Sequence, residues 1–291
     1  MEGRVTAVHS SYCLVWVGGE TVRCSLRGRL RHGSVQVIPG DLVRISRKKD
    51  QGLVEEVLPR KNSLIRPPVA NIDRVVVVTA VTHPPIDLVY VDRILVHLES
   101  QDIDAVVCFN KVDIEDPDEV RRLSAVYEKA GYEVARTSAV TAEGLSDLVQ
   151  RMQGRNVVFA GASGVGKSKI LSSVTERDIS TGRLSKIRRG RHTTKGVTLY
   201  PVEGGAFVAD TPGFSRLDIV DCEPFSLGYY YREMIELAPL CHFPRCLHKT
   251  EELCAVREAL AEGAIAPERY ETYLSLLDEC IEREKRKYGQ D

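Results

Sequence analysis

Short runs of apolar and β-branched residues alternate with polar positions along the first part of the chain, and turn residues separate the runs at Ser10-Ser11, Gly18-Gly19 and Pro39-Gly40-Asp41. The runs predict short strands at residues 4–9, 12–17, 21–27, 41–47 and 52–58. So many strands in so short a segment indicate a small all-β barrel. An OB-fold is the expected form, and such barrels commonly bind oligonucleotides on one face.

From Arg74 onward the pattern changes to buried apolar strands that alternate with amphipathic helices. The predicted strands are residues 75–81, 105–109, 133–136 and 157–160, and the predicted helices are residues 88–99, 117–130 and 144–152. Residues 197–202 and 206–209 are expected to form a hairpin, and residues 267–288 a final amphipathic helix. The alternation predicts an α/β domain with a mainly parallel sheet.

A chain of 291 residues with 43% hydrophobic content can fill more than one core. We predict three domains: the all-β barrel at 1–66, the α/β domain at 67–220, and a mostly helical domain at 221–291. No apolar segment is long enough for a membrane span. The chain is therefore expected to be cytoplasmic, with no membrane partner, and we expect it to be a monomer. Its eight cysteines should then stay reduced, so a cluster of them is interpreted as metal ligands before disulfides.

The charge distribution distinguishes the barrel from the rest of the chain. The net charge is −1 overall, but residues 1–66 hold twelve Lys/Arg and six Asp/Glu. This excess of positive charge favours a nucleic-acid surface. The candidate contacts are Arg23, Arg27, Arg29, Arg31, Arg44, Arg47, Lys48 and Lys49, with Tyr12 and Trp16 available for base stacking. The alternative is a solvated basic surface with Trp16 in the core.

A glycine-rich segment between a predicted strand and helix has the spacing of a phosphate-binding loop, in which backbone N–H groups surround the phosphates. The predicted phosphate-binding residues are Gly161, Ala162, Ser163, Gly164, Val165, Gly166, Lys167, Ser168 and Lys169. Lys167 is expected to reach the β- and γ-phosphates, and Ser168 to ligate Mg²⁺.

The segment Asn110-Lys111-Val112-Asp113 ends an apolar strand and matches a guanine-binding motif. The Asp113 carboxylate can accept two hydrogen bonds from guanine N1–H and N2–H₂, and adenine lacks this donor pair. Lys111 is expected to lie along the base. Thr137-Ser138-Ala139 follows the next strand, where the backbone of Ser138 and Ala139 would support guanine O6. The nucleotide is therefore predicted to be GTP or GDP.

The guanine motif precedes the phosphate-binding loop, whereas an ordinary Ras-like GTPase has them in the opposite order. The chain therefore predicts a circularly permuted Ras-like domain that starts at Asn156, runs to Gly213 and resumes at Arg74. Gln153-Gly154-Arg155 would join the original ends of the domain. So short a connection is plausible because the termini of compact domains often lie close together.

Two further segments supply the expected switch residues. Asp210-Thr211-Pro212-Gly213 ends the last strand, so Asp210 would hold Mg²⁺ through water and the Gly213 N–H would contact the γ-phosphate. In Arg191-His192-Thr193-Thr194, Thr194 is the preferred Mg²⁺ ligand and Thr193 is the alternative. Phe214 occupies the position of the water-orienting glutamine of Ras-type enzymes. His192 can take that role; the alternatives are an RNA contact and a merely exposed side chain.

The spacing Cys241-x4-Cys246-x-His248-x5-Cys254 places three thiolates and one imidazole within a short segment. Such a closed tetrahedral set is typical of structural Zn²⁺. Cys222 is an alternative ligand. The other cysteines, Cys13, Cys24, Cys108 and Cys280, are interpreted as buried small hydrophobes.

The barrel, the permuted motifs and the Cys/His cluster, in this order, resemble the ribosome small subunit-dependent GTPase A (RsgA) family over nearly the whole chain. The resemblance implies an OB-fold, a circularly permuted GTPase and a zinc domain. It also implies that the small ribosomal subunit and its rRNA are partners, with hydrolysis of GTP to GDP and phosphate late in subunit maturation and stimulated by the subunit. A catalytic role has been proposed for the histidine that corresponds to His192. Lys169 and Lys195 depart from residues usual in the family.

The permutation makes residues 214–239 a direct link between the γ-phosphate sensor and the metal-binding domain. The nucleotide state is therefore expected to move that domain. Two other functions are an rRNA-binding scaffold with incidental turnover and a metabolic nucleotide enzyme, for which no substrate-domain signature is present.

Overall fold

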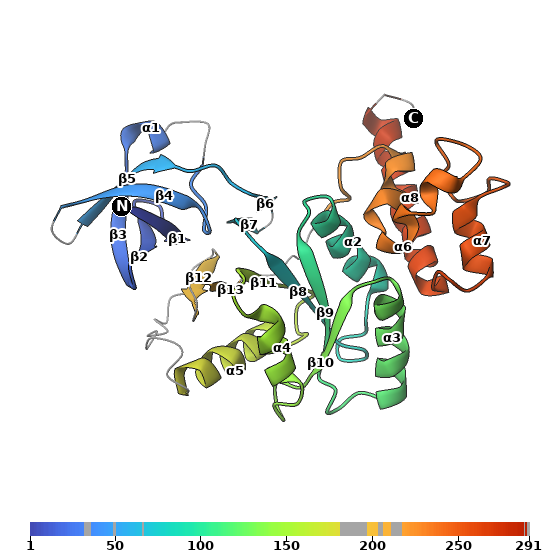
Figure 1. Ribbon diagram of the computed structural model, residues 1–291, viewed down its shortest axis with the longest axis horizontal. Helices are drawn as coiled ribbons and strands as arrows, with labels where there is room; N and C mark the ends of the chain where they lie inside the picture. Colours follow the sequence, from blue (N-terminus) through green and yellow to red (C-terminus); the bar gives the residue numbers. More distant parts are fainter. Residues whose placement is uncertain are drawn as a thin grey trace. The chain divides into compact units, whose positions relative to one another are not determined.

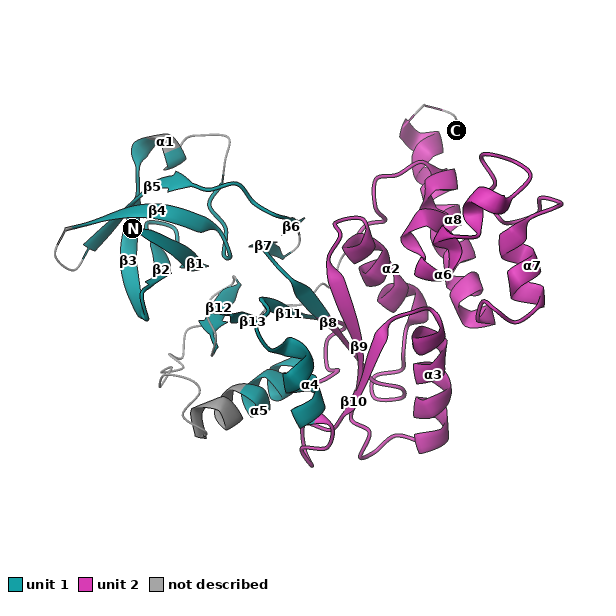
Figure 2. Cartoon of the chain, in the orientation of Figure 1, with its two compact units in different colours: residues 1–75, 145–160, 167–214 teal, residues 76–144, 161–166, 215–291 magenta. Residues whose placement is uncertain are grey.

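The computed structural model describes residues 1–31, 36–48, 51–65, 67–180, 197–202, 206–210, 217–287 and 289. These residues belong to two compact units (Figure 2). Unit 1 comprises Met1–Val75, Leu145–Ala160 and Lys167–Phe214, and unit 2 comprises Val76–Gly144, Gly161–Gly166 and Ser215–Asp291. The three domain boundaries expected from the sequence remain a prediction.

Unit 1 begins with a closed five-stranded barrel in the order β1-β2-β3-β5-β4 (Figure 1). Its strands are β1 (Glu2–Val8), β2 (Cys13–Val17), β3 (Glu20–Leu26), β4 (Leu42–Lys48) and β5 (Gln51–Val57). Apolar side chains at alternating positions fill the interior, among them Val5, Val15, Val43 and Val54, each fully buried. The helical turn α1 (Gly28–Arg31) lies between β3 and β4. The predicted barrel is confirmed.

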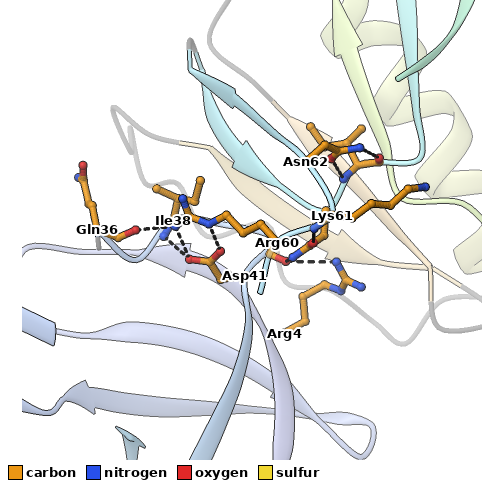
Figure 3. A network of polar contacts seen from close by, with 10 residues as sticks. Arg4, Gln36, Ile38, Asp41, Arg60, Lys61 and Asn62 are labelled. Atoms are coloured by element: carbon orange, nitrogen blue, oxygen red, sulfur yellow. Dashed lines mark hydrogen bonds and ion pairs between the residues drawn. The ribbon is translucent and has the colours of Figure 1, made fainter. Parts of the chain in front are cut away.

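A polar network connects the barrel to the chain that leaves it (Figure 3). The fully buried Asp41 carboxylate accepts hydrogen bonds from the Ile38 N–H at 2.9 Å and from Arg60 Nε at 2.6 Å and Nη2 at 3.0 Å. Arg60 Nη2 also donates to the Gln36 carbonyl at 2.6 Å. The network precedes a hairpin that the sequence pattern did not indicate, formed by β6 (Ser63–Ile65) and β7 (Pro68–Ala70).

The second sheet has the strand order β10-β9-β8-β11-β13-β12. Its strands are β8 (Arg74–Thr79), β9 (Asp104–Asn110), β10 (Glu133–Thr137), β11 (Val157–Ala160), β12 (Thr198–Pro201) and β13 (Phe207–Asp210). β9 pairs with β10 in parallel and β11 with β13 in parallel, whereas β12 and β13 form an antiparallel hairpin. The mainly parallel α/β sheet and its hairpin are therefore as predicted.

Helices follow the strands in both units. Unit 1 holds α4 (Leu145–Met152) and α5 (Lys167–Ser180), and unit 2 holds α2 (Leu88–Glu99) and α3 (Pro117–Lys129). Asp87 caps α2 by accepting a hydrogen bond from the Tyr90 N–H, and Asp116 caps α3 by accepting one from the Asp118 N–H. These caps place the helix starts close to the positions expected from the periodicity.

The C-terminal part of unit 2 is mostly helical: η2 (Pro224–Tyr230), α6 (Arg232–Ile235), η3 (Ala238–Leu240), α7 (Ala255–Ala261) and α8 (Pro267–Lys287). The long helix α8 packs against α2, and Val96 of α2 belongs to the same apolar core as Tyr273, Leu276 and Leu277 of α8. Within the described residues, no helix combines the length and apolar character that a membrane span requires.

A buried ion cluster joins α8 to α2 and α6. Arg269 of α8, 1% exposed, places Nη1 at 2.5 Å from Asp92 Oδ1 and Nε at 2.7 Å from Glu233 Oε1. The ring of Tyr231 lies 4.5 Å from the Arg269 guanidinium carbon. Thr272 also donates a hydrogen bond to Asp92. This interface therefore contains charge as well as apolar side chains.

Candidate guanine nucleotide and metal sites

The phosphate-binding loop connects β11 to α5, and two of its glycines allow close packing. A Cβ at Gly161, whose φ is +132°, would overlap the Val78 carbonyl, and a Cβ at Gly166, whose φ is +99°, would overlap the Asn110 side-chain amide. Only glycine fits such positions without strain. The loop residues Gly161–Gly166 belong to unit 2, and Lys167 begins α5 directly after them in the chain.

The buried Asn110 side chain joins the loops that the motifs identified. Its Nδ2 donates to the Val165 carbonyl of the phosphate-binding loop at 2.8 Å. Its Oδ1 accepts hydrogen bonds from Thr137 Oγ1 at 3.2 Å and from the Ala139 N–H at 3.3 Å. With 2% of Asn110 exposed, these bonds are shielded from water. The predicted guanine motif, phosphate loop and 137–139 segment therefore lie together.

Ser138 stabilises the loop that follows it. Its hydroxyl accepts hydrogen bonds from the Val140 N–H at 3.1 Å and from the Thr141 N–H at 3.0 Å, and its own N–H donates to the Glu143 carbonyl at 3.0 Å. Ser138 is fully buried, so its side chain supports the loop and is not available to a ligand.

The two remaining residues of the guanine motif differ in exposure. Asp113 is exposed, and Lys111 is half-buried with a positive φ of 69°. Lys111 Nζ donates to the His83 carbonyl at 2.5 Å, which holds the lysine side chain over the segment that follows β8. Asp113 thus remains open to a base, while Lys111 has a fixed direction.

Glu115 is a site-forming residue that the motifs did not indicate. Its carboxylate is 7% exposed and accepts hydrogen bonds from the Thr82 N–H at 3.0 Å, the His83 N–H at 3.3 Å and the Thr82 hydroxyl. Burial raises the pKa of Glu115, but the hydrogen bonds from Thr82 and His83 outweigh it, so the pKa is lowered. Glu115 therefore fixes the segment whose carbonyl holds Lys111.

Several predicted nucleotide residues fall outside this group. Lys167 is half-buried, and Ser168 and Lys169 are exposed in the first turn of α5 in unit 1. Asp210 ends β13, but its side chain lies outside the described part of the structure. His192, Thr193, Thr194 and Gly213 also lie outside the described residues.

The four predicted metal ligands form one cluster in the C-terminal part of unit 2. The ligand atoms of Cys241, Cys246, His248 and Cys254 all lie within 4.8 Å of one another. His248 Nδ1 is 3.4 Å from the sulfur of Cys241 and 3.4 Å from that of Cys254, and these two sulfurs are 3.8 Å apart. Within the described residues this is the cluster with metal-binding spacing, and Cys222 is not part of it.

These distances fit a tetrahedral Zn²⁺ site. Zn–S bonds of about 2.3 Å and a Zn–N bond of about 2.0 Å would separate two sulfurs by about 3.8 Å and a nitrogen from a sulfur by about 3.5 Å. The surrounding hydrogen bonds fix the ligand loop, since Tyr270 donates its hydroxyl to the His248 carbonyl at 2.7 Å and Tyr273 donates to the Leu247 carbonyl at 2.9 Å. The residues present can hold zinc.

The barrel surface carries one aromatic and cationic stack. The Tyr12 and His9 rings are stacked with centroids 4.4 Å apart, and the Arg23 guanidinium lies 4.0 Å from the Tyr12 centroid. Trp16 is half-buried. Other predicted RNA contacts already have acidic partners: Arg44 pairs with Glu2 and Glu56, and Arg47 pairs with Glu20.

The remaining basic candidates provide less information. Arg27 is exposed. The side chains of Arg29, Arg31 and Lys48, and residue Lys49, lie outside the described part of the structure.

These features define a P-loop GTPase preceded by a barrel and followed by a Cys/His cluster. Family models agree with this class: the RsgA GTPase model matches residues 57–220, and the RsgA N-terminal domain model matches residues 2–54. The chain belongs to the RsgA GTPase family and is a GTPase, a hydrolase.

Similar proteins cover the full length of the chain. It is 42% identical to the small ribosomal subunit biogenesis GTPase RsgA of Caldanaerobacter subterraneus subsp. tengcongensis, over 99% of this chain and 98% of the relative. The protein of the same name from Halalkalibacterium halodurans is 37% identical over 99% of both chains.

Two solved structures share the fold. YjeQ from Thermotoga maritima has a TM-score of 0.83 and 34% identity over 96% of this chain and 98% of that protein. YloQ, a circularly permuted GTPase, has a TM-score of 0.80 and 34% identity over 97% of this chain and 95% of that protein. The circular permutation inferred from motif order is therefore confirmed as the fold of this chain.

Proposed function

We propose that this chain binds the small ribosomal subunit and hydrolyses GTP to GDP and phosphate during late maturation of that subunit, with hydrolysis stimulated by the subunit. The observation that carries the proposal is the buried Asn110 side chain, which hydrogen-bonds to the phosphate loop and to the 137–139 segment. The name shared by the relatives supplies the subunit as partner.

Guanine recognition is assigned to residues of unit 2. Asp113 is exposed and would accept hydrogen bonds from guanine N1–H and N2–H₂, while Lys111 would lie along the base. The backbone of Ser138 and Ala139 would support O6, with the Ala139 N–H shared between O6 and Asn110 Oδ1, to which it donates at 3.3 Å. A site built around hydrogen bonds to its ligand discriminates by about 10⁴ against an analogue that lacks them. This selectivity would exclude adenine nucleotides.

Hydrolysis is assigned to in-line attack of water on the γ-phosphorus. The backbone N–H groups of Gly161, Ala162, Ser163, Gly164, Val165 and Gly166 would surround the phosphates. Lys167 and Lys169 would add positive charge, and the Gly213 N–H would donate a hydrogen bond to the γ-phosphate. Ser168, Asp210 and Thr194, or Thr193 in its place, would hold Mg²⁺, which supplies charge neutralisation at the phosphate oxygens. His192 would orient the attacking water.

The Cys/His cluster is assigned a structural role. Cys241, Cys246, His248 and Cys254 would hold one Zn²⁺, whose binding contributes folding free energy to the C-terminal region. No catalytic step involves it.

The barrel is assigned to rRNA. Its basic residues and the stack of Tyr12 with Arg23 offer the charge and the flat surface that single-stranded bases use. We further propose that the protein acts in the cytoplasm as a monomer, with a barrel at 1–66, a GTPase domain at 67–220 and a zinc domain at 221–291.

Hydrolysis under single-turnover conditions tests the proposal, with the protein alone, with small subunits and with large subunits in parallel. Small subunits should accelerate phosphate release by at least about tenfold, and large subunits should not. Equal rates in the three reactions, together with binding to small subunits, would indicate the scaffold function instead.

The role of His192 has a separate test. His192→Ala should reduce subunit-stimulated turnover by about 10²-fold, the lower range for loss of one positioned group, with GTP affinity and subunit binding unchanged. If subunit binding falls in proportion to activity, His192 is an RNA contact.

A further inference from the structure

A second pair of cysteines, outside the metal cluster, lies between α8 and the segment that enters the C-terminal region. We call residues 217–223 the strap. Cys222 of the strap is half-buried, and Cys280 of α8 is 2% exposed. The two side chains line the same cavity of about 390 Å³, and Cys222 packs against the apolar core to which Cys280 belongs. Neither belongs to the metal cluster.

The contacts around this pair hold the strap against α8. Arg283 Nη1 donates to the Ile219 carbonyl at 2.7 Å, and Arg283 Nη2 lies 3.2 Å from Asp221 Oδ1. His97 Nε2 of α2 donates to the Asp218 carbonyl at 2.5 Å. Residues three apart share one face of a helix, so Cys280 lies one turn before Arg283 on the face that meets the strap. The two sulfurs are therefore neighbours because several independent contacts place them together.

The two thiols also differ in pKa and in burial. The neighbouring Cys280 thiol lowers the pKa of Cys222, burial and the carboxylates of Asp221 and Glu223 oppose this shift, and the Arg283 guanidinium adds to the lowering. The neighbouring Cys222 thiol, together with burial, raises the pKa of Cys280. Redox-sensing cysteines typically combine an accessible thiolate with a neighbouring thiol that resolves its oxidised form. Cys222, the less buried thiol and the one whose pKa is lowered, is placed to react first, and the buried Cys280 in the same cavity is placed to resolve it.

We propose that Cys222 and Cys280 form a reversible oxidation site, in which a hydroperoxide converts the pair into a disulfide that ties the strap to α8. The Cys222 thiolate attacks the terminal oxygen of the hydroperoxide. The S–O bond forms, the O–O bond breaks, and the departing alkoxide or hydroxide takes up a proton. The Cys280 sulfur then attacks the sulfur of the Cys222 sulfenic acid, and the Cys280 proton leaves with the hydroxide as water. Two thiols and one organic hydroperoxide give a disulfide, one alcohol and one water, and hydrogen peroxide gives a disulfide and two waters.

The disulfide would be transient, because a cytosolic dithiol reductant reverses it by thiol exchange. The oxidant needs to reach only Cys222, so burial of Cys280 does not prevent the reaction. The disulfide would close a loop of residues 222–280, which contains the whole Cys/His cluster. Oxidation would therefore tie the strap, at the start of this region, to α8 at its end.

The test uses the zinc-loaded full-length protein, titrated with hydrogen peroxide, then alkylated and mapped by mass spectrometry. The expected product links the Cys222 and Cys280 peptides, is lighter by two hydrogen atoms, keeps its zinc and reverts with dithiothreitol. Cys108 is the matched control: it is fully buried in the same unit, burial raises its pKa to about 12, and it should stay unmodified.

Two variants separate the steps. In Cys280→Ala, Cys222 should stop at the sulfenic acid, which dimedone would label several-fold more than in the parent protein. In Cys222→Ser, Cys280 should remain a thiol at the same peroxide concentration. A link between Cys222 and a Cys/His cluster residue, a link that appears only after zinc is released, or a Cys222 that stays reduced while Cys108 is modified would overturn the proposal.

Discussion

The guanine loops, by which we mean residues 110–113, 137–139 and 161–166, lie in the same compact unit as the Cys/His cluster but are stabilised differently. In the guanine loops, the buried Asn110 amide bonds protein segments to one another, while Asp113 stays exposed. In the cluster, the ligand groups themselves are buried, with Cys246 at 5%, His248 at 2% and Cys254 at 2% exposure. The guanine loops are therefore held by hydrogen bonds within the protein, whereas the cluster buries polar ligand atoms that the proposed Zn²⁺ would satisfy.

The largest effect should follow from removing two metal ligands. Cys246→Ser combined with His248→Ala should abolish metal binding and loosen residues 240–291, because Zn²⁺ binding free energies of about 10 kcal/mol are coupled to local folding. Metal analysis and amide hydrogen exchange measure both effects.

The guanine loops provide the contrast for this variant, since nucleotide affinity should stay near the parent value. Cys13→Ala, at a buried cysteine of the barrel, is the matched control and should retain its metal. One full equivalent of zinc in the double variant would refute the ligand assignment.

Removing the base contact should change specificity and leave folding intact. Asp113→Asn replaces a carboxylate that accepts two hydrogen bonds by an amide with one acceptor and one donor. GTP affinity should therefore fall by about 10⁴, and xanthosine triphosphate should be favoured. Nucleotide competition measures the preference. Because Asp113 is exposed, the melting temperature should not change. An unaltered preference for GTP would remove Asp113 from the base site.

A third variant tests whether the buried ion cluster of Arg269 stabilises the packing of the C-terminal region against α2, in addition to the proposed metal. Arg269→Ala leaves the carboxylates of Asp92 and Glu233 buried without their partner, so unit 2 should lose about 3–5 kcal/mol. Denaturant unfolding of the zinc-loaded protein measures this loss.

The control for that variant is Arg93→Ala, which removes a pair with Glu279 across the same two helices. Glu279 is 42% exposed and can be solvated once Arg93 is removed, so the loss of stability should be smaller than in Arg269→Ala. Replacing Arg269, Asp92 and Glu233 together by apolar residues should recover most of the loss, because no charge is then left unpaired. Equal losses of unfolding free energy in Arg269→Ala and Arg93→Ala would mean that the Arg269 ion cluster does not specifically stabilise the C-terminal region against α2.

Some of the features that these variants test were predictable from the sequence, and others were not. Periodicity placed the strands of the barrel and the sheet because alternate burial constrains residue type. The Cys/His cluster was recognisable because its four residues are close in sequence. Arg269 was not recognisable, since its partners lie on other elements far along the chain, and a charged residue on an amphipathic helix is normally solvated. The contact between Cys222 and Cys280 likewise depends on how α8 packs.

The smaller misses have similar reasons. The short helices of residues 224–240 have too few turns for a period, and the β6–β7 hairpin has only three residues in each strand. Asn110 belonged to a recognised motif, but its bonds to Val165 and Thr137 became visible only with the fold. The roles of His192, Thr193, Thr194 and Gly213 remain predictions.

The smallest effect should come from Glu115, which tests whether the guanine loops are organised before the ligand binds. Glu115→Gln removes the charge and turns one acceptor into a donor facing the Thr82 N–H, so the segment that holds Lys111 should loosen. Hydrogen bonds to a charged group are worth about 1.5–3 kcal/mol. Because Lys111 transmits only part of this loss to the base, guanine nucleotide should dissociate about tenfold faster, measured with a fluorescent GDP analogue.

The sign of the pH dependence gives an independent check. The pKa of Glu115 is lowered from 4.5 in the folded protein. The stabilisation of the Thr82–His83 segment by the Glu115 carboxylate is therefore fully present above pH 4.5, and it is lost as the pH falls through the lowered pKa. Slow dissociation in the parent should therefore accelerate below about pH 4.5, and the variant should lack this step. Glu119→Gln, an exposed partner of Arg122 on α3, is the matched control and should leave dissociation unchanged. If both variants release nucleotide at the parent rate, Asn110 alone organises the site and Glu115 only stabilises its loop.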